Sequence, residues 1–338
     1  MKKLTKTALA LSALLFAACS GEVKIVNDPY EGIDWTTTLH LKSSLHVHTC
    51  NSTIEHGPEE GTTVTPAEQI DYYEFLGYDV LAITDHDYVS YPWSDYGRSD
   101  SKLVAIQANE LSKNDNMCAF FSDWLDLPGE GPEKTIGFYE SIEAVGQQGG
   151  IIYLAHPMRS GEICKPEFSA DVFRKYPHVV GMEVLNVGQF ERNKSIELWD
   201  AVLSKLMPAR QVWGSSSDDA HSNGMAGFGW TTLLTSERTA EAVRVALCEG
   251  HSTFSTPKLV ENPVGVPPVV CAISHNAEEG TITISASDCD KVVWTSMGVV
   301  VAEGESINYK STKGVKKYLR ATLYGPGGAT FTQPWAVR

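Results

Sequence analysis

Short apolar segments alternate with amphipathic ones through the first two thirds of the chain. Seven apolar runs recur, each ending in polar residues: 45–49, 80–84, 103–108, 117–121, 151–155, 179–185 and 211–216. Helical patterns lie between several of these runs, most clearly at 66–76, 136–147 and 194–206. Near-continuous apolar strands that alternate with helices are typical of parallel βα units covered on both faces. Seven strands within about 180 residues therefore predict an α/β fold, a closed or nearly closed barrel, over 41–258.

The pattern changes after residue 258. A proline-rich linker is predicted at 259–268, and short alternating strands follow to the end of the chain. The expected strands are 269–274, 281–286, 291–296, 299–302, 318–324 and 330–335. Residues 269–338 are therefore predicted to form a small β-sandwich-like domain, for which a packing or spacing role is the simplest interpretation. Cys271 and Cys289 are the one candidate disulfide pair.

The N-terminus predicts export. Lys2, Lys3 and Lys6 precede an apolar run at 8–18, which is too short to span a bilayer and is typical of a secretory signal. The run ends in Ala17-Ala18-Cys19, which resembles a bacterial lipobox in which Cys19 is lipidated. Residues 1–19 are thus predicted to be a lipoprotein signal peptide, and the polar segment 20–40 a tether. An ordinary signal peptide cut near Ala18 is the alternative.

Net charge restricts the partners. The formal charge of −15 argues against a nucleic-acid ligand, because such a surface repels phosphate backbones. An acidic protein that handles a phosphate needs a local positive feature, such as a metal ion or a few arginines. The expected protein is exported and lipid-anchored to the bacterial cell envelope, on the periplasmic or the surface side.

Candidate metal ligands stand where the apolar runs end. In a barrel the carboxyl ends of the strands converge on one face, where active sites of this architecture lie. Alternate residues on a strand point to the same side, so His46 and His48 can share one ion, as can Asp219 and His221. Imidazole nitrogens and carboxylate oxygens are ligands for zinc, manganese and iron. The predicted ligands are His46, His48, His86, Glu110, His156, Asp219 and His221.

The order of these motifs resembles the PHP (polymerase and histidinol phosphatase) domain over roughly residues 40–255. The motifs are His46-x-His48-Thr49-x-x-Ser52, Ile83-Thr84-Asp85-His86, Glu110, Ala155-His156-Pro157 and Asp219-x-His221, with weaker matches at 183–186 and Trp199-Asp200. The resemblance implies a distorted (β/α)7 TIM-like barrel. It also implies up to three divalent ions and a metal-activated water as the nucleophile, with no catalytic side chain assigned.

Carried over residue by residue, the resemblance assigns ligands to three ions. His46, His48, Glu110 and Asp219 would hold the first; Glu110 and His156 the second; His86 and His221 the third. Two family ligands are absent from their expected places. At the first position Thr53 stands in place of the family ligand, although His56 could reach the site from the same loop. The second position falls near Met117, where Asp115 or Cys118 could act as a substitute ligand. One or two bound ions (zinc, manganese or iron) are therefore expected rather than three.

The predicted function is metal-dependent hydrolysis of a small phosphorylated substrate, a phosphoesterase reaction. Arg159 and Arg192 are the candidate cations for substrate phosphate. Cys50 lies close to the first motif, but packing explains it better than a nucleophilic role. Two alternatives remain. The same metal chemistry could act on a carboxylic ester or amide, or a degenerate barrel could bind metal or ligand at the cell surface without turnover. Thr53 and Met117 favour the last.

Overall fold

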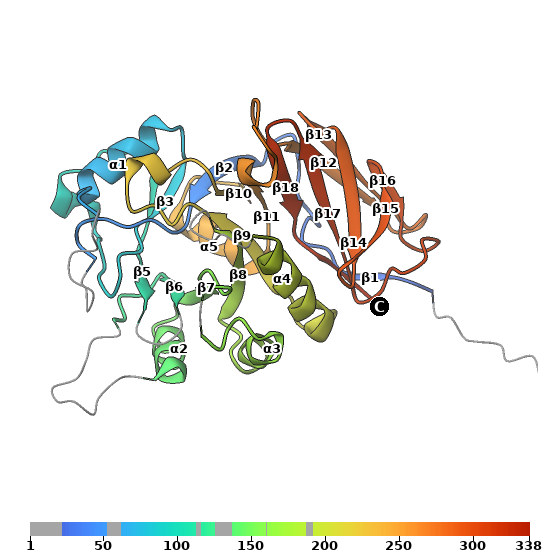
Figure 1. Ribbon diagram of the computed structural model, residues 1–338, viewed down its shortest axis with the longest axis horizontal. Helices are drawn as coiled ribbons and strands as arrows, with labels where there is room; N and C mark the ends of the chain where they lie inside the picture. The colour runs from blue at the N-terminus through green and yellow to red at the C-terminus, as the bar shows by residue number, and fades with distance from the viewer. Residues whose placement is uncertain (1–21, 53–61, 113–115, 126–136, 160, 187–191) are drawn as a thin grey trace, which may run out of the picture.

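The structure is a computed structural model that describes residues 22–52, 62–112, 116–125, 137–159, 161–186 and 192–338. A part with mixed helices and strands lies beside a β-rich part (Figure 1). The helices are α1 (Pro66–Phe75), α2 (Phe138–Gln147), α3 (Pro166–Lys175), α4 (Arg192–Leu206) and α5 (Ala240–Glu249), with 3-10 turns η1 (Trp93–Tyr96), η2 (Asn223–Met225) and η3 (Pro257–Leu259).

The strands fall into two groups along the chain. Those of the mixed part are β2 (Leu39–Ser44), β3 (Val80–Ala82), β4 (Val104–Ile106), β5 (Ala108–Leu111), β6 (Met117–Phe120), β7 (Ile151–Leu154), β8 (Val179–Asn186), β9 (Trp213–Ser217), β10 (Trp230–Thr235) and β11 (Ser252–Thr256). Those of the β-rich part are β1 (Ile25–Asn27), β12 (Val269–Asn276), β13 (Thr281–Ser287), β14 (Lys291–Ser296), β15 (Val299–Glu303), β16 (Ser306–Asn308), β17 (Tyr318–Gly325), β18 (Gly328–Thr332) and β19 (Trp335–Val337).

The helix ends follow local capping rules. At the start of α1 the Thr65 side chain accepts the backbone N–H of Glu68, while the Glu68 carboxylate accepts the N–H of Thr65. Gly77 follows that helix with φ +72°, a conformation that glycine adopts without steric cost. The three predicted helices lie within about two residues of the observed bounds, the scatter normal for helix ends. Helices α3 and α5 were not predicted.

The strands of the mixed part belong to two separate sheets, where one barrel was predicted. Strands β2, β3 and β4 run parallel within an eleven-stranded sheet, whereas β5 to β9 form a separate five-stranded sheet. In the second sheet β6 is antiparallel to both of its neighbours, and only β7, β8 and β9 run parallel. Two isolated bridges link the sheets, Val47 with Ala220 and His86 with Glu110. The mixed α/β class is confirmed, but among the described residues no continuous ladder closes the ring, so the distorted (β/α)7 barrel that was expected does not form a closed barrel.

One sheet joins the two parts of the molecule. Strand β11 pairs antiparallel with β18, which continues into β17 and β19. The predicted all-β tail therefore contains the expected strands but shares its main sheet with the mixed part. A second sheet of β12, β13 and β16 packs on it around a core that includes Trp294, Trp335 and Tyr309. Cys271 and Cys289 are both free, so the suggested disulfide is wrong.

The segment predicted as a tether is folded from residue 22 onward. Strand β1 pairs with β19, which places this segment at the outer edge of the sheet. The buried Tyr30 hydroxyl donates to the Ser252 carbonyl oxygen at 2.9 Å and packs against Trp335. The sparse apolar residues of the segment thus suffice to attach it to the β-rich part, and the tether prediction is wrong for residues 22–40.

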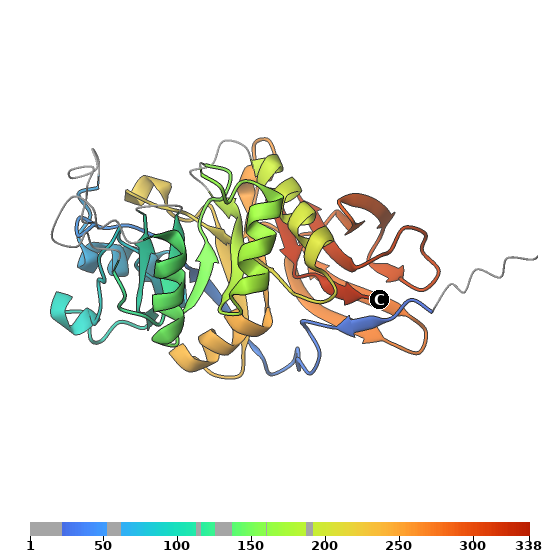
Figure 2. The same cartoon turned by 90° about the horizontal axis from the view of Figure 1, so that it is seen from below.

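A buried ion pair fixes α4 against the β-rich part. Arg320 on β17 makes a bidentate contact with Asp200 on α4, with Nε 2.8 Å from Oδ1 and Nη2 2.7 Å from Oδ2. The Tyr318 hydroxyl donates to the same carboxylate at 2.8 Å. Helices α3 and α4 pack on β8 and α2 packs on β7, so these three helices cover the five-stranded sheet (Figure 2).

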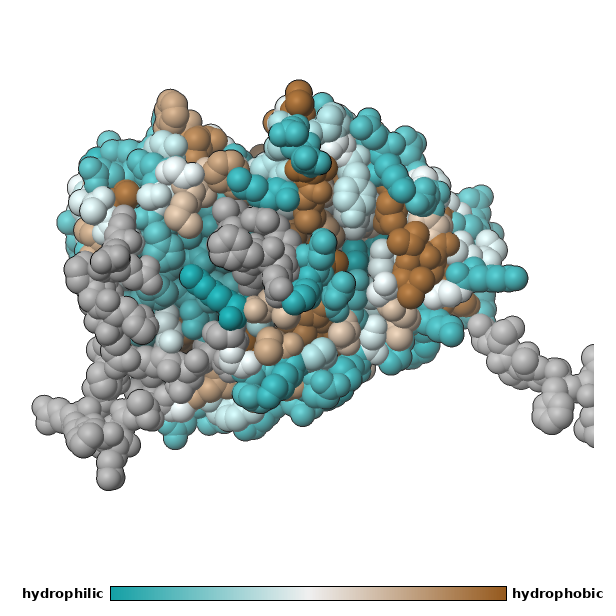
Figure 3. All heavy atoms as spheres, in the orientation of Figure 1, coloured by the Kyte–Doolittle hydropathy of each residue, from teal (hydrophilic) through white to brown (hydrophobic). Residues whose placement is uncertain are grey.

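Hydrophilic residues cover most of the face shown in Figure 3, and hydrophobic residues there form separate patches. In the described part of the chain, no helix combines the length and the hydropathy needed to cross a bilayer.

Candidate metal centre

The seven predicted ligands converge on one site. His46 and His48 follow β2, His86 follows β3, Glu110 lies on β5, and the others follow β7 and β9. The bridges at Val47 and at His86 align these segments, so that ligands distant in sequence face one another. His156 and Asp219 have positive φ angles of 25° and 50°, backbone conformations that are uncommon for residues other than glycine.

Four of the ligands surround one point. His46 Nε2 lies 3.1 Å from His48 Nε2, 3.2 Å from Glu110 Oε2 and 3.3 Å from Asp219 Oδ1. His48 Nε2 lies 3.3 Å from the same Glu110 oxygen and 3.1 Å from the same Asp219 oxygen. Ligand atoms that share one tetrahedral ion with bonds of about 2.0 Å stand about 3.3 Å apart, so these five separations are compatible with one divalent ion. The four side chains therefore fit a divalent ion.

The Glu110 carboxylate supports the same conclusion. Its Oε2 atom is buried and makes no hydrogen bond with any described residue, although imidazole nitrogens of His46, His48 and His86 lie 3.0 to 3.3 Å away. A buried charged oxygen without a donor is costly, and a metal ion removes that cost. The protein is thus arranged for a cation at this atom.

Burial and neighbouring charges shift the pKa values of the two acidic ligands in opposite directions. Burial by itself raises the pKa of Glu110 and of Asp219, but the neighbouring histidines, His46 first, outweigh it and hold both pKa values well below the usual range. Burial likewise lowers the pKa of His46, yet the adjacent Cys118 thiol and three carboxylates outweigh it and raise this pKa well above 6.5. The acids are therefore ionised and ready to bind a cation.

Metal affinity should rise with pH because an ion must displace the proton of His46. This histidine holds its proton to a pH above 6.5, while a ligand imidazole must be neutral. Affinity should fall as the pH drops below the raised pKa and level off above it. The stability of the metal-free protein depends on pH in the opposite direction. The stabilisation that charged His46 contributes is present below pH 6.5 and is lost as the pH rises through the raised pKa of His46.

Calorimetric titration in buffers of different ionisation enthalpy measures the protons released on binding. We expect about one proton per first ion near pH 7 and fewer near pH 9. Binding without proton release at neutral pH would contradict a protonated His46.

A second group of ligand atoms adjoins the first. His156 Nε2 lies 2.9 Å from Glu110 Oε1, the carboxylate oxygen turned away from the first group. Glu110 therefore has one oxygen toward each group, as a bridging ligand requires. The Asn116 amide nitrogen lies 3.0 Å from this Oε1 atom and 3.4 Å from His156 Nε2. Asn116 belongs to none of the motifs in the sequence, and an isolated amide gives no signal of its own there.

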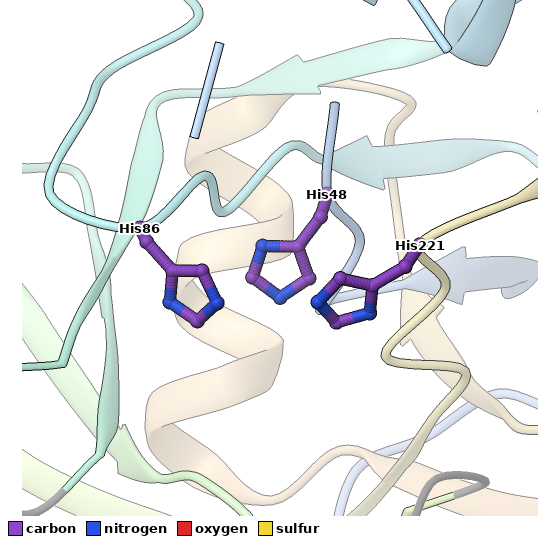
Figure 4. Close-up of side chains that lie close together, drawn as sticks. All are labelled: His48, His86 and His221. Carbon is purple, nitrogen blue, oxygen red and sulfur yellow. The ribbon is translucent and has the colours of Figure 1, made fainter. Parts of the chain in front are cut away.

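The third predicted pair is split by another ring. Figure 4 shows the His48 imidazole between those of His86 and His221. Its centroid lies 4.3 Å and 4.2 Å from theirs, while the outer rings are 6.1 Å apart. Nitrogen atoms of all three lie within 4.8 Å of one another. His48 Nε2 faces the first group and is not turned toward an ion held by His86 and His221. The structure therefore supports the third predicted ion less well than the first two.

Two further buried residues orient the ligands. Glu183 Oε1 lies 2.9 Å from His46 Nδ1, which directs His46 Nε2 toward the first group, and its Oε2 accepts the backbone N–H of His156 at 2.8 Å. The Asn186 amide donates to Glu183 Oε2 at 2.9 Å and to Asp219 Oδ2 at 3.3 Å. The weak motif at 183–186 therefore has a positioning role that the sequence did not reveal.

Neighbouring acids of the same motifs serve the scaffold. Asp85 accepts both the backbone N–H and the hydroxyl of Thr49, together with the hydroxyls of Ser52 and Ser90. Asp218 accepts three backbone N–H groups of the loop 227–229. Both carboxylates hold the ligand-bearing loops in place rather than facing the cluster.

The predicted cations and substitute ligands have different outcomes. Arg159 Nη1 lies 3.4 Å from Asp219 Oδ2, so one predicted cation stands at the cluster with a side chain 53% exposed. Met117 is buried in the hydrophobic core, and the buried Cys118 thiol lies with His46 and Glu183, apart from the second group of ligand atoms. The side chain of Arg192 and the whole of Cys19, Thr53, His56 and Asp115 lie outside the described residues.

Comparison with known proteins gives a structural match. Neither a protein-family model nor a curated protein matches the sequence. A two-domain protein from Bacteroides vulgatus ATCC 8482, containing a predicted PHP-like metal-dependent phosphoesterase, aligns with 93% of this chain and 98% of its own, at 15% identity and a TM-score of 0.51. The alignment covers both parts of the molecule, so the two-domain arrangement is shared as well as the mixed part.

Two other solved structures align over little more than half of this chain. An amidohydrolase from Chromobacterium violaceum with bound sulfate and no metal covers 53% of this chain and 87% of its own, at 13% identity and a TM-score of 0.37. PsfC from Pseudomonas syringae PB-5123 covers 57% and 82%, at 12% identity and a TM-score of 0.38.

Proposed function

From the fold that this chain shares with a PHP-like two-domain protein, we propose that it is a divalent-metal-dependent hydrolase of phosphoesters. The observation that carries the proposal is the buried group of His46, His48, Glu110 and Asp219, in which each imidazole Nε2 lies 3.1 to 3.3 Å from the other and from one oxygen of each acid. The second group on the other oxygen of Glu110 supports a pair of ions. Zinc, manganese and iron suit this mixture of imidazole and carboxylate ligands.

A bound divalent ion would supply Lewis acidity, lowering the pKa of bound water to about 7 and stabilising charge on phosphoryl oxygens. The chain's own residues provide the rest. Glu183 fixes the tautomer and orientation of His46. The Asp219 carbonyl oxygen lies 3.0 Å from His221 Nδ1 and accepts a hydrogen bond from its N–H, which leaves Nε2 as the basic nitrogen of that ring. No serine or cysteine nucleophile is required.

Arg159 favours phosphoesters over carboxylic esters. Its guanidinium is the described cation next to the cluster, and planar guanidinium groups suit phosphate oxygens. Because it reaches past Asp219 from an exposed position, it can contact the outer part of a substrate. An acidic chain that binds a phosphate depends on such local positive charge.

Activity assays on matched substrates test the proposal. Metal-loaded protein should cleave aryl phosphomonoesters or diesters and leave aryl carboxylic esters and anilides intact. A His46→Ala, His48→Ala double variant should lack both metal and activity. Cleavage of the carboxylic substrates alone would replace the phosphoesterase with an esterase or amidase. Retained metal without cleavage of either class would favour a binding protein.

Replacing Arg159 with methionine should raise the KM for phosphoesters about tenfold and change kcat less. A charge-assisted hydrogen bond is worth about 1.5–3 kcal/mol, and exposure of the side chain reduces this value. Steady-state kinetics with zinc or manganese measure the two constants, and Arg174→Met on the exposed side of α3 is the control. An unchanged KM would remove Arg159 from the substrate site.

A further inference from the structure

The side chain of Asn116 occupies a distinctive place beside the metal centre. Its amide nitrogen lies 3.0 Å from Glu110 Oε1 and 3.4 Å from His156 Nε2, and these two atoms are 2.9 Å apart. The backbone holds it there, because the carbonyl oxygen of Asn116 accepts the N–H of Ala155, the residue before His156. Asn116 therefore faces the second group of ligand atoms from a fixed position at the start of β6.

We propose that Asn116 is the third protein ligand of a second divalent ion, which it binds through its side-chain oxygen together with Glu110 and His156. This inference rests on the proposed metal centre and adds a ligand to it. Ligand atoms on one octahedral ion with bonds of 2.1 Å stand about 3.0 Å apart, and on a tetrahedral ion about 3.4 Å apart. The three separations around Asn116 fall in this range.

The amide orientation is the one expected of the site without an ion. Without a cation at the second position, the amide nitrogen is the end that suits the Glu110 carboxylate, since it donates a hydrogen bond. A half-turn about the last side-chain bond exchanges nitrogen for oxygen at the same place. Carboxamide oxygens are common ligands of hard cations. The side chain can therefore alternate between closing the metal-free site and binding the ion.

The neighbouring residues leave this role to Asn116. Met117 points into the hydrophobic core, and the Cys118 thiol lies against His46 and Glu183 rather than His156. Within the described residues, the loop before β6 thus brings the Asn116 amide to Glu110 and His156.

A neutral amide oxygen has consequences for the ions. It is a weaker and harder ligand than imidazole, so the second ion should bind less tightly than the first. The second site should also prefer zinc over manganese by a smaller margin than the first site does. Replacing Asn116 with histidine should strengthen zinc binding at the second position.

The test counts ions on metal-free full-length protein titrated separately with zinc and manganese. Asn116→Leu, of similar size, should weaken the second ion about 100-fold and leave the first within about threefold. Asn116→His should tighten the second zinc at least about tenfold. Asn193→Leu, on the exposed start of α4, is the matched control. The electron paramagnetic resonance spectrum of coupled manganese ions should disappear in the leucine variant and persist in the control.

Either of two results would overturn the inference. The leucine variant could bind both ions like the unchanged protein, or the histidine variant could leave second-site zinc affinity unaltered. Because binding is measured without substrate, failure of the phosphoesterase proposal is separable. If the ions bind as expected but no ester is cleaved, only the phosphoesterase proposal fails. If esters are cleaved but ion binding is unaltered in both variants, only the role of Asn116 fails.

Discussion

Replacing Glu110 with glutamine should empty both metal positions and lower hydrolysis at least about 10³-fold, since the ions supply several kcal/mol of transition-state stabilisation. Glu110 has an oxygen in each ligand group, Oε2 toward His46 and His48 and Oε1 toward His156. A neutral amide keeps the size but removes the charge that both ions share. Elemental analysis and kcat/KM on the same samples measure the effect.

An exposed glutamate provides the control for this change. Glu197→Gln on the solvent side of α4 should keep the ions and the activity. Added metal should also raise the Tm of the control and leave that of Glu110→Gln unchanged, because a ligand stabilises only a fold that binds it. A Glu110→Gln protein with both ions and more than about a tenth of the activity would contradict the bridging role.

The placement of the ligands was predictable because the relevant motifs are local. His46-x-His48 puts both imidazoles in the first ligand group. In Asp219-x-His221 the backbone turns at Asp219 with φ 50°, so Asp219 joins the first group while His221 stacks on His48. The prediction of the ligands was therefore little affected by an error in the strand bounds. The strand expected at 45–49 is β2 at Leu39–Ser44, yet the bridge between Val47 and Ala220 still holds the two motifs side by side.

The supporting residues were harder to predict because they act across long sequence distances. Glu183 reaches His46 from 137 positions away, and its burial as an ionised group makes sense only beside that ring. Asn116 belongs to no metal-binding motif, and its proximity to His156 follows from the β6–β7 pairing. Patterns of polar and apolar residues identify which faces are buried, but they do not name the partners of each side chain.

Non-local pairing also explains the errors in domain organisation. The alternation at 330–335 predicts a strand, but nothing within it indicates β11 as its neighbour. The segment 20–40 resembles a tether because it is polar and holds few apolar residues, whereas Tyr30 is buried against the last strand. A few anchoring contacts outweigh the average composition, and average composition is what a sequence pattern measures.

Removing the carboxylate of Asp200 should destabilise the whole protein by about 3–5 kcal/mol, because it leaves the Arg320 guanidinium charged, buried and unpaired. Arg320 is 3% exposed and Asp200 is 7% exposed, so solvent cannot replace the lost partner. The same carboxylate accepts the Tyr318 hydroxyl, which also loses its acceptor in Asp200→Ala. Since α4 and β17 meet at this pair, the effect should extend to both parts of the molecule.

Urea denaturation followed by tryptophan fluorescence measures the loss, because the Arg320 guanidinium lies 5.4 Å from the Trp199 ring. The exposed pair of Arg174 and Asp171 is the control, and Asp171→Ala should change stability by less than about 1 kcal/mol. A double variant, Asp200→Leu with Arg320→Met, should recover most of the stability, since an apolar pair of similar volume leaves no charge buried. Equal losses in the single and double variants would mean that packing, rather than the unpaired charge, accounts for the effect.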